Sequence, residues 1–147
     1  MTKIFVINGP NLNLLGDREP EVYGTTTLKE IEQLCRDVAR EAGAEVDFRQ
    51  TNDEGTFIDW LHEARQSADA VVLNPAAFTH HSYAVAEAVS ALDVPVVEVH
   101  LSNIYSREEW RRRSVVSPVA TAVVAGLGAR GYTVAVAAAC ELAEGKG

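Results

Sequence analysis

The chain has 147 residues, 47% of them hydrophobic and 23% charged, which is typical of a globular protein. Its length predicts one domain, residues 1–147, burying roughly 70% of the surface that the unfolded chain exposes. The net charge of −8 argues against a nucleic-acid-binding surface, and no apolar run approaches the roughly 20 residues that a membrane span needs. The first residues form a strand pattern rather than a signal segment, which predicts a cytoplasmic protein. Cys35 and Cys140 lie in helical patterns and are expected to be buried, reduced thiols.

Strand and helix patterns alternate five times along the chain. The strands are short and mostly apolar, and they are predicted over residues 3–8, 45–51, 70–74, 94–99 and 120–125. A helix is predicted after each strand, over residues 27–42, 56–67, 82–92, a short segment capped by Ser106, and 129–142. Such alternation indicates a parallel sheet with helices on both faces, joined by right-handed crossovers.

The second strand predicts the order of the sheet. Val46 and Phe48 alternate with charged residues there, as in a strand at the edge of a sheet. The fold class is therefore predicted as α/β, a flavodoxin-like three-layer sandwich with a five-stranded parallel sheet of order 2-1-3-4-5. In this topology a ligand binds beyond the carboxyl ends of strands one and three, with strand four next to them.

Polar residues follow three of these strands at the point where each strand ends. They occupy residues 8–11, 74–82 and 100–103. Because the ends of neighbouring parallel strands lie at one edge of the sheet, these residues are expected to share a cleft. His100 there is suited to general acid or base catalysis. Asn11, Asn74 and Ser102 could bind hydroxyl groups or stabilise an oxyanion.

Arginine dominates the basic residues, with ten arginines against three lysines, and four of the arginines lie within residues 107–113. In an acidic protein this cluster indicates a local anion site. The alternative is a solvated helix face on which the arginines pair with Glu108 and Glu109.

The segment 16–24 is a charged loop between two glycines, placed where it could close over the cleft. It carries Arg18 and Tyr23. A tyrosine can act as a base near neutral pH when nearby cations favour the phenolate. The alternative is an ordinary surface loop with a packed tyrosine.

Other motifs indicate little chemistry. Residues 126–131 match G-x-G-x-x-G but follow the last strand, so a tight strand-to-helix turn is the preferred interpretation. Neither a P-loop nor a G-x-S-x-G elbow occurs, and asparagines stand where a phosphoacceptor module needs acids. His80 and His81 are adjacent and poorly placed to share one metal ion.

Together these segments resemble the type II 3-dehydroquinate dehydratase family over essentially the whole chain and in the right order. The matching stretches are residues 8–13 (NGPNLN), 18–24, 74–75, 79–80, 98–103 (EVHLSN), 107–111 and 126–132. Their combination is far more specific than any single motif.

The resemblance implies a lyase (a hydro-lyase) of the shikimate pathway, which leads to chorismate and the aromatic amino acids. The reaction is an anti elimination of water from 3-dehydroquinate through an enolate, giving 3-dehydroshikimate. No metal or organic cofactor is implied. The substrate is a small anion, which agrees with arginines in an acidic protein.

The same resemblance assigns catalytic roles. Tyr23 would remove the proton next to the ketone, and Arg18 and Arg107 would favour its phenolate. His100 would protonate the departing hydroxyl, with Glu98 orienting the imidazole. An acid and a base on opposite faces of a ring suit an anti elimination.

Asn11 is implied to stabilise the enolate through a water molecule. The substrate-binding residues would be Asn74, His80, Leu101, Ser102 and Arg111, together with Glu87 from a neighbouring subunit. The family assembles as trimers within a homododecamer, and the same self-association is expected here.

The chain departs from the family pattern at four positions. Ala76 stands where glycine is common, Phe78 where tyrosine or leucine is, His81 where threonine is, and Glu87 where aspartate is. Two alternatives to an active dehydratase therefore remain open. One is a family member with altered activity, and the other is a flavodoxin-like module that binds a nucleotide or a partner protein.

Overall fold

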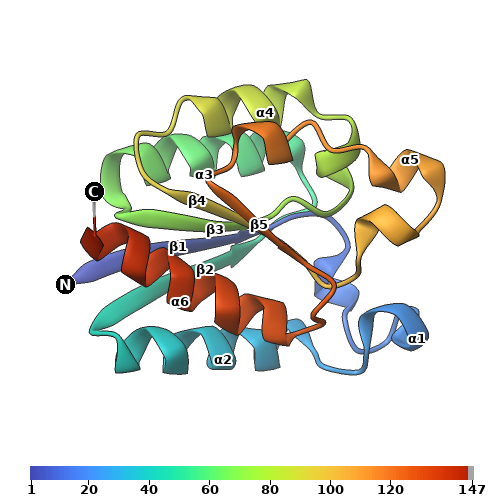
Figure 1. Ribbon diagram of the computed structural model, residues 1–147, viewed down its shortest axis with the longest axis horizontal. Coiled ribbons are helices and arrows are strands. Elements are labelled where there is room, and N and C mark those ends of the chain that lie inside the picture. The colour runs from blue at the N-terminus through green and yellow to red at the C-terminus, as the bar shows by residue number, and fades with distance from the viewer. Residues whose placement is uncertain (146–147) are drawn as a thin grey trace.

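A five-stranded parallel sheet with helices on both faces forms the molecule, as the computed structural model of residues 1–145 shows (Figure 1). The strands are β1 (Thr2–Asn8), β2 (Ala44–Gln50), β3 (Ala70–Asn74), β4 (Val96–His100) and β5 (Ala122–Ala125). The helices are α1 (Pro20–Tyr23), α2 (Leu28–Glu41), α3 (Glu54–Ser67), α4 (Tyr83–Ser90), α5 (Glu109–Arg112) and α6 (Arg130–Gly145).

The strand order is β2-β1-β3-β4-β5, so the predicted flavodoxin-like α/β sandwich is confirmed, including the edge position of β2. Helices α2 and α6 cover one face of the sheet, and α3 and α4 cover the other (Figure 1). The short helices α1 and α5 lie together beyond one end of the sheet, near the carboxyl ends of the strands (Figure 1). The polar segments after β1, β3 and β4 emerge at that end.

The period of two along each strand divides the core between the two faces. Ile4 and Val6 of β1 pack with α2 and α6, whereas Phe5 and Ile7 pack with α3 and α4. Since successive side chains of a strand point to opposite faces, a strand buried on both sides must be apolar throughout. This explains the apolar runs in β1 and β3, whereas β4 (VVEVH) is interrupted by the buried Glu98.

Local signals set most helix starts. The capping box predicted at Thr27 and Glu30 is present, and Ser82 accepts the Val85 N–H as the predicted cap of α4. Asp53 caps α3 by accepting the Thr56 N–H at 2.8 Å, so that helix begins two residues before the prediction.

The predicted cap at Ser106 is wrong. Its hydroxyl donates to the carbonyl of Asn103 inside a 3-10 turn, and α5 starts only at Glu109. Arg107 therefore lies before the helix and extends from the turn itself. The predicted charged loop at 16–24 also contains a helical turn, α1, that begins at Pro20, a residue whose fixed φ suits a first helical position.

None of the helices within residues 1–145 has the length and apolar character to cross a membrane.

Candidate active site

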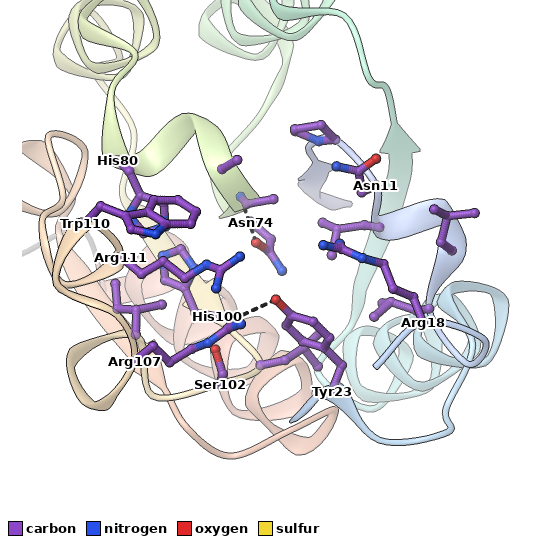
Figure 2. A pocket seen from close by; sticks show the side chains of 18 residues that line it. Asn11, Arg18, Tyr23, Asn74, His80, His100, Ser102, Arg107, Trp110 and Arg111 are labelled. Atoms are coloured by element: carbon purple, nitrogen blue, oxygen red, sulfur yellow. Dashed lines mark hydrogen bonds between the residues drawn. The ribbon is translucent and has the colours of Figure 1, made fainter. Parts of the chain in front are cut away.

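One pocket lies at the carboxyl ends of the strands, and the predicted site residues meet there (Figure 2). Its space amounts to about 740 Å³ including the part open to solvent. All predicted site residues except Glu87 and Glu98 line it. The lining consists of Pro10, Asn11, Leu12, Leu14, Leu15, Arg18, Tyr23, Asn74, Ala76, Ala77, His80, His100, Leu101, Ser102, Ile104, Arg107, Trp110 and Arg111.

The ends of β1 and β3 form the floor of this pocket. Gly9 follows β1, and its N–H donates to the carbonyl of Asn74 at 2.8 Å. A Cβ at Gly9 would lie 2.5 Å from the carbonyl oxygen of Pro75, so only glycine allows the two loops to approach this closely. Asn11 comes next in a left-handed conformation, with φ of 68°, which asparagine tolerates.

Tyr23 reaches into the pocket from α1 and meets a cation there (Figure 2). Nη1 of Arg107 donates to the phenol oxygen at 2.6 Å, and the Arg107 guanidinium lies 5.2 Å from the ring centroid. Arg18 approaches the same ring at 6.0 Å. A guanidinium can only donate, so the phenol oxygen of Tyr23 accepts this hydrogen bond from a positively charged group.

His100 lies on the other side of the pocket, above a buried carboxylate. Its Nε2 lies 2.5 Å from Oε2 of Glu98, a side chain with no solvent exposure. Burial by itself opposes the charge on Glu98, but hydrogen bonds from His100, Ser117 and Thr79 hold the pKa of this carboxyl below its ordinary value. Glu98 therefore remains a carboxylate and orients the imidazole from behind.

His80 forms part of a side wall with Trp110 and Arg111 (Figure 2). Its Nδ1 lies 2.8 Å from the carbonyl oxygen of Arg113, and because a carbonyl only accepts, Nδ1 carries a hydrogen. Burial lowers the pKa of His80, which keeps the ring neutral. Its Nε2 is then free to accept a hydrogen bond from a ligand hydroxyl.

Asn74 is held by a buried relay of polar groups. Its Nδ2 donates to the hydroxyl of Tyr132 at 2.8 Å, and that hydroxyl donates to Oδ1 of Asn8 at 2.6 Å. The backbone N–H of Ala76 donates to Oδ1 of Asn74 at 3.1 Å. These contacts fix which side of the Asn74 amide carries the oxygen, leaving one N–H of Nδ2 for a ligand.

Glu87 lies apart from this pocket. It is an exposed residue of α4, and it contributes nothing to the site within one chain.

Several residues of the site were not predicted. Trp110 has the Arg111 guanidinium 4.2 Å from its ring centroid and stands edge-on to His80 at 5.3 Å. Trp110 lies in the stretch 107–111 that matches the family, so the sequence pointed to this segment but not to Trp110 itself. Tyr132 and Thr79 also lie in quoted stretches, 126–132 and 79–80, but were given no role, whereas Ser114 and Ser117 lie outside every quoted stretch.

Within residues 1–145, no group of three or more histidine, cysteine, aspartate or glutamate side chains is placed to hold a metal ion. The cations facing the pocket are arginines instead, and a small anion is the ligand that such a site attracts.

Comparison with known proteins agrees with this geometry. The family model for class II dehydroquinases matches residues 2–140. A 3-dehydroquinate dehydratase of Pelotomaculum thermopropionicum is 56% identical over 141 residues, covering 96% of this chain and 98% of its own. One from Rhizobium meliloti is 52% identical, covering 96% and 95%.

Solved structures lead to the same family. The type II dehydroquinase of Propionibacterium acnes matches with a TM-score of 0.92 and 44% identity, over 95% of this chain and 97% of its own. That of Butyrivibrio crossotus matches with a TM-score of 0.91 and 39% identity, over 94% and 97%. On these grounds, the chain belongs to the class II dehydroquinase family.

Proposed function

We propose that this pocket converts 3-dehydroquinate to 3-dehydroshikimate by an anti elimination of water through an enolate. The activity itself, that of a type II 3-dehydroquinate dehydratase in the shikimate pathway, follows from membership of the family. The stereochemistry, the residues that carry the reaction and the assembly are the proposal.

Tyr23 is the base in this scheme, and Arg107 and Arg18 favour its phenolate. The phenolate removes the proton next to the ketone, and the electron pair moves onto the carbonyl oxygen to give an enolate. Asn11 stabilises that oxygen through a water molecule. The enolate then collapses, the C–O bond breaks, and the departing oxygen takes a proton from His100 and leaves as water.

Substrate binding falls to the walls of the pocket. Arg111 is the cation for the carboxylate, because its side chain is only 18% exposed and lines the pocket. Asn74, His80, Ser102 and the backbone of Leu101 bind the ring hydroxyls. Neither a metal nor an organic cofactor takes part in the proposed steps.

The hydrogen bond from Arg107 to the phenol oxygen of Tyr23 carries this proposal. This contact puts a guanidinium on the phenol oxygen of Tyr23 in the same pocket as His100, which supports Tyr23 as the base. An anti elimination requires a base and an acid on opposite faces of the ring, and each contributes typically about 10²–10⁴-fold to the rate.

Turnover of 3-dehydroquinate, followed by the ultraviolet absorbance of the conjugated product, tests the proposal. Tyr23→Phe should lower kcat by at least about 10²-fold while the ligand still binds. Tyr105→Phe is the matched control, because this tyrosine is half exposed and does not line the pocket. Near-normal turnover in Tyr23→Phe would remove Tyr23 from its role.

Self-association completes the proposal. Trimers within a homododecamer would bring Glu87 of one chain to the pocket of the next, and its exposed position on α4 supports such a contact. Light scattering should give a mass of twelve chains. A monomer with full activity would contradict the role of Glu87.

We further propose that residues 1–147 act as one domain in the cytoplasm, where a reducing environment suits the two buried free thiols, Cys35 and Cys140. The alternatives, a nucleotide- or partner-binding module and a family member with altered activity, predict no rise in absorbance with 3-dehydroquinate.

A further inference from the structure

Glu98 accepts three hydrogen bonds although no part of it reaches solvent. His100 donates to Oε2 at 2.5 Å, and Thr79 donates to the same oxygen at 2.7 Å. Ser117 donates to Oε1 at 2.7 Å. The donors come from three separate segments of the chain, and each occupies its own position around the carboxylate. A buried carboxylate needs such partners to remain charged.

The hydroxyl hydrogens of Thr79 and Ser117 have only one consistent direction, toward Glu98. Ser114 Oγ accepts the backbone N–H groups of Val116 and Ser117 at 3.2 and 2.9 Å, and it lies 2.9 Å from Ser117 Oγ. Ser117 has one hydrogen, and it points to Glu98 because a carboxylate can only accept. Ser114 Oγ also lies 3.3 Å from Thr79 Oγ1, so the hydrogen of Ser114 points either to Ser117 or to Thr79, and both of these donate to Glu98. Every hydrogen in the chain therefore points toward Glu98.

This polarity determines which nitrogen of His100 carries a hydrogen. A carboxylate behind the ring requires an N–H at Nε2. Nδ1 has no hydrogen-bond partner within residues 1–145, and every fully buried side-chain polar atom there has one. Nδ1 is therefore accessible, and since His100 lines the pocket, Nδ1 is the nitrogen that faces a ligand.

We propose that Thr79, Ser114 and Ser117 are positioning residues, which keep Glu98 ionised and so make Nδ1 of His100 the atom that gives its proton to the departing hydroxyl. This inference rests on the proposed dehydration and specifies its acid step. The proton leaves Nδ1, the hydroxyl oxygen keeps the electron pair of the broken C–O bond, and water departs. His100 is left neutral with its hydrogen on Nε2.

The hydrogen-bond network around Glu98 also connects His100 to the wall of the pocket that contains His80. The backbone N–H of Val115 donates to the carbonyl of Thr79 at 2.8 Å, and the carbonyl of Arg113 receives the Nδ1 hydrogen of His80. The segment 113–117 thus orients both histidines of the pocket from behind. A hydroxyl lost from this segment would disturb His100 without removing any group that touches the substrate.

Nitrogen-15 NMR of histidine-labelled protein at alkaline pH, without substrate, tests the inference directly. In the wild-type protein Nε2 of His100 should give the shift of a protonated nitrogen and Nδ1 that of an unprotonated one. In Thr79→Val/Ser117→Ala, Glu98 loses two donors and takes up a proton from solvent at a higher pH than in the wild type. Protonated Glu98 then donates to Nε2, so on lowering the pH the neutral ring should carry its hydrogen on Nδ1. A wild-type ring protonated at Nδ1 would overturn the proposal.

Activity provides the second readout. Each of Thr79→Val and Ser117→Ala should lower kcat by about ten- to a hundredfold with a smaller change in KM, since each removes one hydrogen bond to a charged group. Thr79→Ser and Ser117→Thr keep the hydroxyl and should restore most of the rate. Thr133→Val, whose hydroxyl bonds only a helix carbonyl on α6, is the control and should keep full activity.

The two readouts separate this inference from the proposed function. If the wild-type protein does not dehydrate 3-dehydroquinate, the NMR measurement still decides the arrangement at His100. If the hydrogen moves in the variants but kcat does not change, the residues do not act through His100 and the proposal is wrong. Should the double variant fail to fold, the single variants and their hydroxyl-retaining partners decide the question.

Discussion

Ala76 adopts a backbone conformation that alanine seldom takes. Its φ is 52°, in the left-handed region, and it lies between Asn74 and His80 on the edge of the pocket. For a residue with a Cβ this conformation costs about 1–2 kcal/mol. The surrounding contacts offset the cost, because the N–H of Ala76 donates to the side chain of Asn74. The turn after β3 is therefore held in place by its neighbours.

Ala76→Gly should relieve this strain. Glycine has about 0.5–1 kcal/mol more conformational entropy to lose on folding, so the free energy of unfolding should stay constant or rise by up to about 1 kcal/mol. Ala137→Gly at an exposed position of α6 should instead lower it by about 1 kcal/mol. Urea denaturation of both variants makes the comparison, and equal losses in the two would show that Ala76 is not strained.

The Ala76 turn also shows the limit of sequence reasoning at this scale. The departure from glycine was visible in the sequence, but its consequence was not, because φ depends on the loops that meet there. In the same way the pocket residues Tyr23, His100 and Arg107 were found from their motifs. Ser114 and Ser117 were not, and Thr79 stood in a quoted motif without a role, since a hydroxyl becomes important only when folding brings a buried carboxylate beside it.

At the scale of elements, α6 does more than cover the sheet. Tyr132 extends from its first turn between β1 and β3, where its hydroxyl accepts from Asn74 and donates to Asn8. Burial raises the pKa of Tyr132, so the hydroxyl keeps the proton that this relay needs. One helix side chain thereby sets the orientation of an amide in the pocket.

Tyr132→Phe should weaken both folding and substrate binding. It leaves Oδ1 of Asn8 and Nδ2 of Asn74 without their buried partner, at a cost of about 1–3 kcal/mol in the free energy of unfolding. With the Asn74 amide less well oriented, KM should rise more than kcat falls. Denaturation and steady-state kinetics measure the two effects. Unchanged KM and stability would mean that water or another group replaces the hydroxyl.

Periodicity and caps predicted the elements well because those signals are local. Strands β1 and β3 and helices α2 and α4 began within two residues of the prediction. The failure at α5 had a physical cause. The Ser106 pattern resembled a capping box, but Asn103 turns the chain first by accepting the N–H of Tyr105 at 3.1 Å. Asn103 and Ser106 are both possible caps and lie three residues apart, and the sequence alone does not show which of them begins a helical turn.

At the scale of the whole molecule, the net charge of −8 is distributed unevenly. The pocket gathers Arg18, Arg107 and Arg111, which produces a local cation site in an acidic protein and favours the approach of an anion. At the edge of the sheet that β2 forms, Arg49 binds Asp47 and Glu63 through four hydrogen bonds of 2.6–2.8 Å. That arginine serves the fold rather than the site.

Arg49 ties the edge strand to the rest of the protein. Its guanidinium lies 4.9 Å from the ring centroid of Phe5 in β1 and 5.6 Å from that of Trp60 in α3. Hydrogen bonds from Arg49 hold the pKa of Asp47 and of Glu63 below their ordinary values of 3.8 and 4.5. Arg49→Met should lower the free energy of unfolding by about 1–2 kcal/mol near pH 7.

The same contacts predict how stability depends on pH. Because the folded-state pKa values of Asp47 and Glu63 are lowered, the unfolded chain binds protons first as the pH falls. Their stabilisation is present above pH 4.5 and is lost as the pH drops through the lowered values. Burial lowers the pKa of His80 from 6.5, so a separate, earlier loss should begin below pH 6.5. Both losses make the protein less stable in acid.

Arg49→Met separates these two contributions. Without the arginine, Asp47 and Glu63 return toward their ordinary pKa values, and the decline below pH 4.5 should become shallower. The decline that begins below pH 6.5 should remain, since the contacts of His80 involve Arg113 and Trp110 and not Arg49. Urea denaturation of both proteins across this pH range measures the slopes, with Arg65→Met on α3 as the control. Parallel curves for Arg49→Met and the wild type would show that the acid sensitivity does not come from this edge of the sheet.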